Sequence, residues 1–563
     1  MDNSYKRFLI RFIKPHASTM AILIALNFVS TLFSFVTPLL EKSLIDDVFI
    51  GGRTDLLVYI LLGTAGTYII SSISTYISVY KKGKLDLILF NDVAKETFNS
   101  IQFASVEKIQ GKKVGDLLSR VLANTRSAVS IFTHIIPGFV VNVIQMITLF
   151  SIMLFLNLYL TIIVVIPALL FLIPMLFFGK RLEDTQRVSL HKTASMYSFL
   201  KENLSMIPLI KAFGLETWSQ EKFNEQMNGY YDASIDYTKN SSLNSSIDSL
   251  IYGVPMVLLV LFGGSMVVRG SMTIGTFTAF MSYVILFFGP ITQFAYIWSY
   301  YKSTSPAFDR INEIFNMERD EGGEEELIMK DGIVTFDDVW FSYNNKPILQ
   351  GFNATFERGL NYVIGDNGAG KSTILKLLCS LYSLDKGFIK IDGQEISRLR
   401  RTDLRKSISI IFSEPYLFDG SIYENIRIGN LSASKDEIVQ AAKKVGVHEF
   451  IMDLPNRYDT QVGEGGLKLS SGEKQKISLA RAILKNSPIV LLDEVTKSID
   501  VDSRRFINEV INELKKDKTI IIVTHYLNEV ERDSNKIYLN QKNRHGNHIY
   551  RSVDASMSNI ASL

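Results

Sequence analysis

The sequence predicts an α-helical transmembrane region of six spans with long cytoplasmic extensions, followed by an α/β domain with a helical subdomain. Two observations carry this prediction. Mean hydropathy over the 563 residues is positive at +0.16, and 47% of the residues are hydrophobic, more than a soluble chain of this size needs. The apolar stretches long enough to cross a bilayer all lie before residue 300, whereas short strand-like runs follow later.

Composition divides the chain into three parts. We predict a transmembrane domain over residues 1–317 and the α/β domain over residues 333–563. Between them lies an acidic linker, 318–332, which opens with the run Glu318-Arg-Asp-Glu-Gly-Gly-Glu-Glu-Glu326. A charge run of this kind is typical of a solvated connection between domains.

The spans follow from length, because about 20 apolar residues cross a bilayer as a helix. The six predicted spans are 17–40, 56–80, 135–156, 158–178, 247–268 and 274–298. Lys and Arg number 21 in the segments on the N-terminal side and 3 in the turns on the other side. Basic loops favour the cytoplasmic side. We therefore expect the N-terminus and the α/β domain to be cytoplasmic in a multi-pass protein of a bacterial plasma membrane.

Three further features of the membrane half carry expectations. Residues 6–14 mix basic and apolar residues and predict an interfacial helix. The segments 81–132 and 180–245 have helical periodicity, which predicts that membrane helices continue into the cytosol as extended hairpins. The last span is rich in aromatic residues. Lipid-facing packing, an interfacial aromatic belt or contact with an amphipathic cargo would each explain them.

One glycine-rich stretch in the α/β domain has the pattern of a phosphate-binding loop, G-x-x-x-x-G-K-S. It follows a short apolar strand at 361–364 and precedes a helical pattern at 374–382, as this motif requires. Backbone N–H groups at the helix start would surround phosphates, Lys371 would reach the β and γ oxygens, and the Ser372 hydroxyl would ligate Mg²⁺. The predicted nucleotide-binding residues here are Gly365, Asp366, Asn367, Gly368, Ala369, Gly370, Lys371, Ser372 and Thr373.

Acidic and basic side chains follow two other apolar strands. The run 489–492 delivers Asp493 and Glu494, and the strand 519–523 ends near His525. After a phosphate loop, this arrangement predicts that Asp493 holds Mg²⁺, largely through water, and that Glu494 is the general base for an attacking water. His525 would contact the γ-phosphate, so Glu494, His525 and Lys371 are the predicted catalytic residues.

The run Leu469-Ser-Ser-Gly-Glu473, followed by Lys-Gln-Lys-Ile-Ser-Leu-Ala-Arg-Ala482 and then the Asp493-Glu494 strand, resembles the signature segment of ABC transporters. Six spans fused ahead of such a domain resemble an exporter half-transporter of the type IV arrangement. Further matching segments are Gly115 to Arg120, Ile210 to Glu216, and Gly463 to Gly465.

The resemblance implies an ATP-hydrolysing transporter in which two chains dimerise and enclose ATP and Mg²⁺ between them. It places Tyr343 on the adenine base, Glu464 near the coupling helices and Asp500 in a loop facing the partner. The signature residues Ser470, Ser471, Gly472 and Glu473 would contact ATP from the partner's side. A homodimer suffices and a heterodimer stays open. The expected cargo is an amphipathic small molecule, lipid or peptide. Net charge is only +3, which gives no reason to expect nucleic acid.

Four positions depart from the family pattern, and one of them is Glu473 in the signature, where glutamine is usual. Ser413 aligns with the usual glutamine that would approach Mg²⁺, and neighbouring Glu414 is a possible substitute. Ser471 adds a side chain where glycine is usual, and Val495 replaces a proline. These departures leave open an ATP-gated channel or regulator with weak hydrolysis. An importer built on the exporter fold is a further alternative.

Overall fold

The computed structural model describes residues 8–466, 468–495, 501–525, 530–531, 534–539 and 550–553. The chain forms two compact units, each treated separately below. The membrane unit comprises Met1–Ser100 and Lys112–Asn316, and the ATP-binding unit comprises Ile101–Gly111 and Met317–Leu563. A short segment from the first half of the sequence, Ile101–Gly111, therefore belongs to the second unit. We call this segment the first tip.

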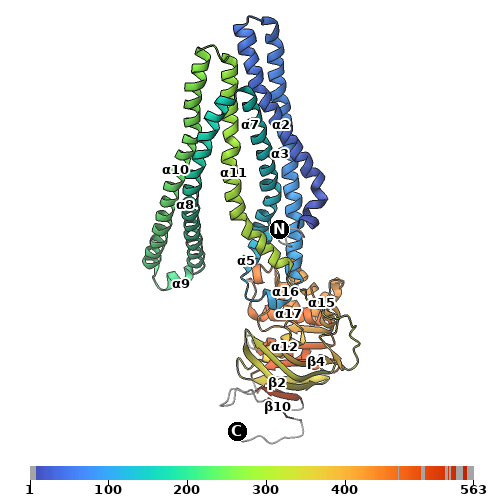
Figure 1. The fold of residues 1–563 in the computed structure, drawn as a ribbon. Helices are drawn as coiled ribbons and strands as arrows, with labels where there is room; N and C mark the ends of the chain where they lie inside the picture. Colours follow the sequence, from blue (N-terminus) through green and yellow to red (C-terminus); the bar gives the residue numbers. More distant parts are fainter. Residues whose placement is uncertain are drawn as a thin grey trace. The chain divides into compact units, whose positions relative to one another are not determined.

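The membrane unit is entirely helical over its described residues (Figure 1). Its elements in chain order are η1 (Leu9–Ile13), η2 (Lys14–His16), α2 (Ala17–Ser43), η3 (Leu44–Ile50), η4 (Thr54–Leu56), α3 (Leu57–Gln102), α5 (Val114–Ser119), η5 (Arg120–Asn124), α6 (Thr125–Ser130), η6 (Ile131–Ile135), α7 (Ile136–Leu156), α8 (Leu158–Ser205), α9 (Ile207–Ala212), α10 (Glu216–Val268) and α11 (Ile274–Phe315).

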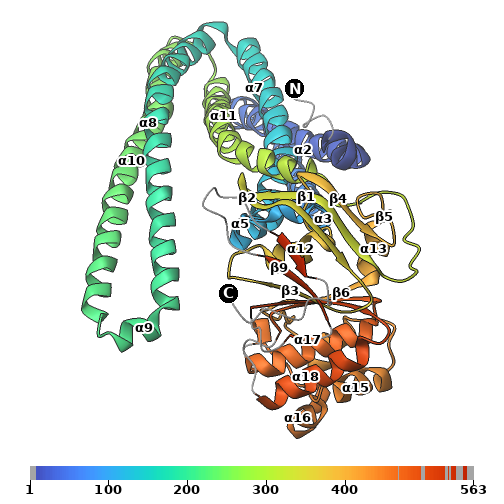
Figure 2. The ribbon, with the colours of Figure 1, turned by 90° about the horizontal axis from the view of Figure 1, so that it is seen from below.

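Five helical stretches are long and apolar enough to cross a membrane, and they contain five of the six predicted spans. The remaining prediction, 158–178, lies in α8, where a shorter apolar stretch is described over Leu158–Pro167. The sixth span therefore stays a prediction. The extended hairpin expected from 180–245 is confirmed, since α8 and α10 run past the apolar stretches side by side and are joined at their ends by α9 (Figures 1 and 2). The helix expected to extend from 81 onward is confirmed for α3, which continues to Gln102, whereas its pairing as a hairpin stays a prediction.

Helix α11 packs its central aromatic residues inside the membrane unit. Phe280, Tyr283 and Phe288 are at most 1% exposed. The Tyr283 hydroxyl donates a 2.6 Å hydrogen bond to the carbonyl of Phe35 on α2. None of the three explanations predicted for the aromatic residues of this span fits these side chains, which pack within the protein instead. Trp298 lies farther along the helix and is exposed.

The N-terminal segment, predicted to be an interfacial helix over 6–14, buries apolar side chains within the membrane unit. Phe8 and Phe12 are buried in a cluster with Phe132 and Phe308, and the Phe8 and Phe132 rings stack at 5.1 Å. The apolar side chains of the described part pack on helices of the same unit, and the interfacial position of this segment stays a prediction. An apolar stripe at helical spacing fits lipid and protein equally well, so the sequence pattern could not separate the two.

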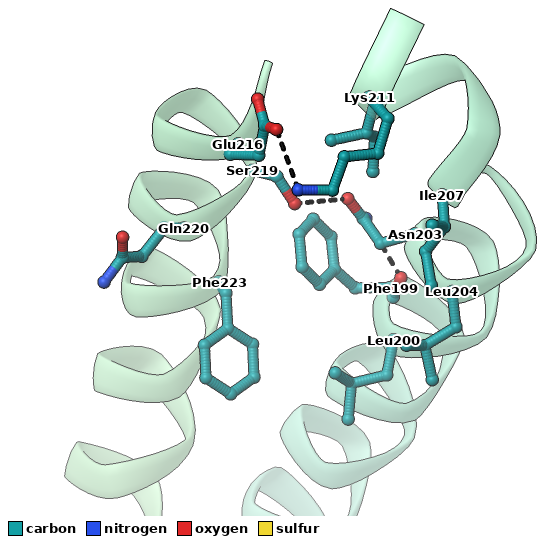
Figure 3. A pocket seen from close by; sticks show the side chains of 11 residues that line it. Phe199, Leu200, Asn203, Leu204, Ile207, Lys211, Glu216, Ser219, Gln220 and Phe223 are labelled. Carbon is teal, nitrogen blue, oxygen red and sulfur yellow. Dashed lines mark hydrogen bonds and ion pairs between the residues drawn. The ribbon is translucent and has the colours of Figure 1, made fainter. Parts of the chain in front are cut away.

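A second tip, residues 204–216, closes the α8–α10 hairpin through α9. Lys211 pairs with Glu216 at 2.9 Å, and the Ser219 hydroxyl donates to the Asn203 side-chain oxygen at 2.9 Å. Beside these polar contacts lies an open hollow of about 300 Å³ with Phe223 on its wall (Figure 3). Much of the apolar surface of this tip is exposed, including Leu204, Met206, Ile207, Leu209 and Phe213.

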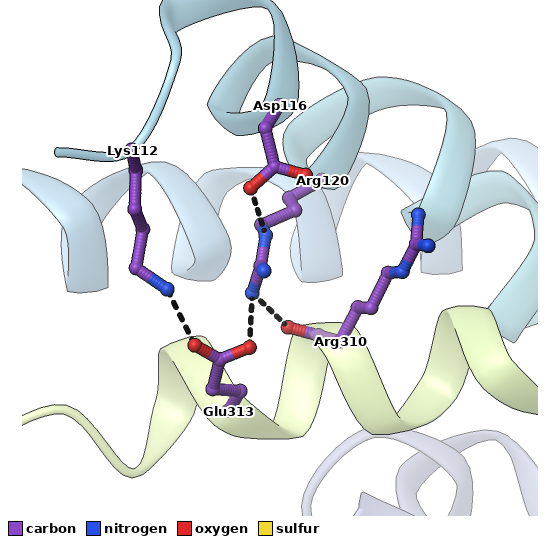
Figure 4. Close-up of polar contacts among 5 residues, drawn as sticks. All are labelled: Lys112, Asp116, Arg120, Arg310 and Glu313. Carbon is purple, nitrogen blue, oxygen red and sulfur yellow. Dashed lines mark hydrogen bonds and ion pairs between the residues drawn. The ribbon is translucent and has the colours of Figure 1, made fainter.

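An ionic cluster joins α11 to the helices that follow the first tip (Figure 4). The buried Arg120 guanidinium donates to Asp116 at 2.9 Å, to Glu313 at 2.7 Å and to the Arg310 carbonyl at 3.0 Å. Lys112 pairs with the other carboxylate oxygen of Glu313. Glu313 thus holds two cations from one stretch of chain, which fixes the end of α11 against α5 and η5.

The ATP-binding unit contains two sheets. Its strands are β1 (Val334–Tyr343), β2 (Lys346–Phe356), β3 (Gly359–Gly365), β4 (Lys386–Ile391), β5 (Gln394–Glu395), β6 (Ile408–Ile411), β7 (Ile489–Asp493), β8 (Thr519–Thr524), β9 (Asn535–Leu539) and β10 (Tyr550–Val553). One sheet is antiparallel in the order β2-β1-β4-β5. The other has the order β10-β9-β3-β8-β7-β6 and is parallel from β9 to β6.

The helices of this unit lie between and beyond the sheets (Figure 2). They are α4 (Val106–Ile109), α12 (Lys371–Leu378), α13 (Arg401–Ser407), α14 (Ile422–Arg427), α15 (Lys435–Lys444), α16 (His448–Asp453), η7 (Arg457–Asp459), η8 (Glu464–Gly466), α17 (Ser471–Lys485) and α18 (Val501–Leu514). Helix α12 lies between the sheets, and α15, α17 and α18 lie beyond the parallel sheet. The α/β domain with a helical subdomain is therefore confirmed.

Two local expectations have clear outcomes. The helix after the phosphate loop begins at Lys371 and ends at Leu378, earlier than the predicted 382, because Cys379 and a left-handed Ser380 (φ +51°) terminate it. The acidic linker is not solvated throughout. Asp320 is largely buried and pairs with Arg401 at 3.0 Å and with Arg405 at 2.5 Å.

Candidate nucleotide site

The phosphate loop connects β3, an inner strand of the parallel sheet, to α12. Ala369 is buried, whereas Asp366, Asn367 and Gly368 are exposed at the tip of the loop. Gly370 has φ +95°, and an added Cβ would lie 2.8 Å from the Ile348 side chain, so glycine is required there. The loop can therefore close tightly before the helix starts.

The Lys371 ammonium points back into this loop. It donates to the carbonyl oxygens of Gly365 at 2.8 Å and Asp366 at 2.9 Å, and its side chain is only 5% exposed. A buried cation at the start of a helix faces the same space as the loop N–H groups, which suits a polyphosphate anion.

Two oxygen ligands of the kind Mg²⁺ prefers meet beside the lysine. The Ser372 hydroxyl donates to the Asp493 carboxylate at 2.8 Å, and Asp493 is buried at the end of β7. Burial raises the pKa of Asp493, and the nearby Glu494 carboxylate raises it further, against the opposing effect of the Ser372 hydrogen bond. A hard divalent cation would offset this concentration of buried negative charge.

Glu494, His525 and Lys371 converge at one edge of the parallel sheet. A Glu494 carboxylate oxygen lies 3.1 Å from His525 Nδ1 and 3.8 Å from the Lys371 ammonium. The Glu494 backbone has φ +47°, a left-handed conformation uncommon for residues other than glycine, and its N–H donates to the Val523 carbonyl of β8. This bond to the neighbouring strand holds the unusual conformation, and the carboxylate is directed toward the lysine.

The predicted adenine residue, Tyr343, lies at the end of β1 in a group of aromatic rings. Its ring lies edge-on to Phe341 at 4.7 Å and to Tyr382 at 5.2 Å. Burial raises the pKa of Tyr343, while the hydroxyls of Thr373 and Tyr382 act against that rise. The Tyr343 hydroxyl is itself buried and makes no hydrogen bond among the described residues.

Ser413 and Glu414 are both exposed on a hollow of about 500 Å³ that Ser372 and Asp493 also line. The structure therefore places the substituted glutamine position beside the predicted Mg²⁺ residues. Gln110 of the first tip lines the same hollow. Sequence reasoning missed Gln110 and Tyr382, because neither belongs to a local motif that signals a nucleotide site.

The signature residues form the start of α17. Ser470 is the N-cap: its hydroxyl accepts from the Glu473 N–H at 3.3 Å, and the Glu473 carboxylate accepts from the Ser470 N–H at 2.7 Å. Glu473 therefore completes a capping box. Ser470 and Ser471 are exposed, and Gly472 lies in the first turn. Asp500 lies outside the described residues, so its predicted role has no structural test.

Comparison with known proteins agrees with this architecture. Residues 20–291 match the family described as "ABC transporter transmembrane region", and residues 349–497 match the family described as "ABC transporter". The chain is 28% identical over 538 residues to the Bacillus subtilis protein named "Putative multidrug export ATP-binding/permease protein YgaD", covering 93% of this chain and 92% of that protein. A Staphylococcus aureus protein of the same description is 30% identical over 549 residues, covering 93% of each.

A solved structure shares the fold. It is a bacterial Atm1-family ABC exporter with ATP bound, with a TM-score of 0.80, 23% identity, and coverage of 94% of this chain and 93% of that chain. Fused membrane and nucleotide-binding regions thus extend through nearly the whole length of the relatives. The chain belongs to the ABC transporter family and is an integral membrane, ATP-driven exporter half-transporter of the type IV arrangement.

Proposed function

We propose that this half-transporter exports an amphipathic small molecule, lipid or peptide by alternating access, as a dimer powered by ATP hydrolysis at Glu494. The convergence of Glu494, His525 and Lys371 carries the catalytic part of the proposal. Lys371 binds the β and γ oxygens, and Glu494 accepts the proton of the attacking water. His525 orients the Glu494 carboxylate and contacts the γ-phosphate.

We assign Mg²⁺ to Ser372 and Asp493, whose oxygens already lie together at 2.8 Å. The ion would neutralise phosphate charge, and Asp493 would hold it largely through water. Ser413 is a third candidate only through a water, since its side chain is short. Removing Mg²⁺ with EDTA should abolish hydrolysis, and Asp493→Asn should weaken the Mg²⁺ dependence of ATP binding.

The adenine and signature residues complete the proposed site. Tyr343 stacks on the base, and the P-loop from Gly365 to Thr373 surrounds the phosphates. A second chain supplies Ser470, Ser471, Gly472 and Glu473. The two serines are exposed at the start of α17, which leaves the helix N-terminus accessible. Such a terminus attracts the γ-phosphate through the positive end of the helix dipole. Asp500 belongs to the same interface by resemblance.

Exposed apolar surface on the second tip supports the dimer independently. A contiguous group of large apolar side chains on a water-exposed surface marks an interaction site. The second chain would cover this tip when ATP closes the dimer. A homodimer suffices because Lys371, Asp493, Glu494 and His525 are all present. Native mass measurement in detergent would show a homodimer, and a stable monomer with ATP would contradict it.

The relatives named for multidrug export support an amphipathic cargo. We place the protein in a bacterial plasma membrane, with the ATP-binding unit cytoplasmic, from the excess of basic residues in the predicted inner loops. No feature of its charge favours nucleic acid as a partner.

Uptake of an amphipathic dye by sealed vesicles with outward-facing ATP-binding units tests this function. Export predicts accumulation against a gradient with ATP and Mg²⁺, and none in Lys371→Ala. Dye release that requires ATP binding without hydrolysis would instead identify a gated channel or regulator. Depletion of dye from loaded vesicles would identify an importer. Uphill accumulation by Lys371→Ala would contradict the assigned energy source.

A further inference from the structure

The first tip is held to the ATP-binding unit by three kinds of contact. The Ser105 N–H donates to the Glu318 carbonyl at 3.2 Å, and the Asp320 N–H donates to the Phe103 carbonyl at 2.8 Å. Val106 packs against the hydrophobic core between the sheets. The third contact is polar: the Tyr382 hydroxyl donates a hydrogen bond to the side-chain carbonyl of Gln110.

Tyr382 lies between this tip and Tyr343, the predicted adenine residue, and contacts both. It follows the C-terminal end of α12 and is 8% exposed. Its ring lies perpendicular to the Tyr343 ring, with centroids 5.2 Å apart and an interplanar angle of 90°. Tyr382 therefore contacts Tyr343 through its ring and Gln110 through its hydroxyl.

We propose that Tyr382 is a positioning residue for Tyr343, and that Gln110 of the first tip holds Tyr382 in place and thereby sets the affinity of the site for ATP. This inference rests on the proposed adenine-stacking role of Tyr343. It gives the first tip an indirect, regulatory link to the base end of the nucleotide, through Tyr382 and Tyr343. Gln110 acts through Tyr382 and touches neither substrate nor reacting atoms in the proposal.

The geometry explains why a single hydrogen bond matters here. The Tyr343 ring lies perpendicular to the rings of both Phe341 and Tyr382 and contacts each of them, so the freedom of Tyr382 limits the freedom of Tyr343. Burial raises the pKa of Tyr382 to about 12, so its phenol stays protonated and remains a donor to Gln110 at neutral pH. Without that bond, Tyr382 can turn, and Tyr343 must be ordered when ATP binds.

Hydroxyl removal separates positioning from packing. Tyr382→Phe keeps the ring in the core and deletes only the donor, and Gln110→Ala deletes the acceptor. Gln110→Glu keeps an acceptor oxygen and should restore nearly normal behaviour. Gln102→Ala is the matched control, because Gln102 is an exposed glutamine of the same tip. All variants are compared as full-length protein in lipid nanodiscs.

We expect Tyr382→Phe and Gln110→Ala to raise the KM for ATP about two- to tenfold, the range for loss of one neutral hydrogen bond. The double variant should match the single variants, because the two side chains form one contact. Inorganic tripolyphosphate has no base, so its inhibition constant should not change. The kcat should stay within about twofold, since Lys371 and Glu494 are intact.

An unchanged KM for ATP in both single variants would overturn the inference. So would additive effects in the double variant, or an equal rise in the tripolyphosphate constant, which would indicate general distortion of the phosphate loop. These outcomes differ from failure of the proposed function. That failure would appear as absent hydrolysis in the unaltered protein, or as full hydrolysis in Lys371→Ala.

Discussion

The two tips of the long helices are covered in different ways. The first tip belongs to the ATP-binding unit, where Val106 packs on the core and Gln110 binds Tyr382. The second tip belongs to the membrane unit, and Phe213 near its end is 70% exposed. One helical extension thus ends in a tip that packs within the ATP-binding unit, and another ends in a tip whose large apolar side chains stay exposed within the membrane unit.

This difference teaches that the membrane unit does not cover the second tip over its described residues, so the tip needs another surface. Exposed large apolar groups cost free energy in water unless another surface covers them. A second chain is the proposed cover for the second tip. The first tip instead contacts Tyr382, beside the predicted adenine residue of its own chain. The variants below test whether the two tips divide these tasks.

The largest effect on ATP turnover should come from Glu494→Gln, which removes the proposed general base. We expect ATP turnover to fall at least about 100-fold, the usual contribution of a general base, while binding of a fluorescent ATP analogue persists. Glu449→Gln is the matched control, because Glu449 is exposed on α16 and does not line the hollow with Ser372 and Asp493, and it should change turnover by less than about twofold. Normal turnover in Glu494→Gln would show that Glu494 is not the general base.

Exposed phenylalanines allow a direct comparison of the tips. Phe213 on the second tip is 70% exposed and Phe103 on the first tip is 63% exposed. We expect Phe213→Ser to lower ATPase activity about tenfold by weakening docking by about 1.4 kcal/mol, with little change in melting temperature. Phe103→Ser should change activity by less than about twofold, because its side chain is not part of the tip's buried contact. Equal losses in both variants would contradict the division of tasks.

The ionic cluster of Figure 4 anchors the chain that leaves the first tip. Glu313→Gln should lower the free energy of unfolding by about 1 kcal/mol, because it leaves the buried Arg120 with one carboxylate partner. The loss is modest because the Glu313 side chain is 49% exposed. Asp309→Asn, at an exposed acid of the same helix, is the control. A melting temperature equal to that of the control would show that the cluster contributes no stability.

The smallest expected effect is on the pH dependence of stability and concerns Asp493, a predicted Mg²⁺ residue that belongs to neither tip. Because burial raises the folded pKa of Asp493 above the unfolded value of about 4, the folded state binds this proton more tightly. The resulting stability is fully present below the unfolded pKa and is lost as pH rises through the folded pKa. Thermal unfolding without Mg²⁺ or nucleotide should show this decline in the unaltered protein and a flatter profile in Asp493→Asn. Parallel profiles would contradict the assignment.

Local sequence predicted the nucleotide half better than the tips. Parallel strands deliver their C-terminal residues to one sheet edge, so Lys371, Glu494 and His525 could be expected near one another from their positions after apolar strands. The capping box at Ser434, which begins α15, is a signal of the same local kind, because it lies within four residues. The chemical roles of these catalytic residues stay predictions.

Contacts between distant residues left no comparable signal. Gln110 and Tyr382 are 272 positions apart, and neither stands in a motif. Periodicity predicted that the helices extend beyond the membrane, but it could not show that one tip joins the ATP-binding unit. Nor could it distinguish lipid from protein around Phe8, because both bury an apolar face in the same way.

Hydrogen–deuterium exchange of the Glu494→Gln protein, with and without ATP and Mg²⁺, tests the division between the tips most directly. We predict that ATP slows amide exchange in the second tip, around Ile207 to Leu215, as a second chain covers it. Exchange in the first tip, around Ser105 to Gln110, should be slow in both conditions. Protection of the first tip alone, or of neither tip, would contradict this division.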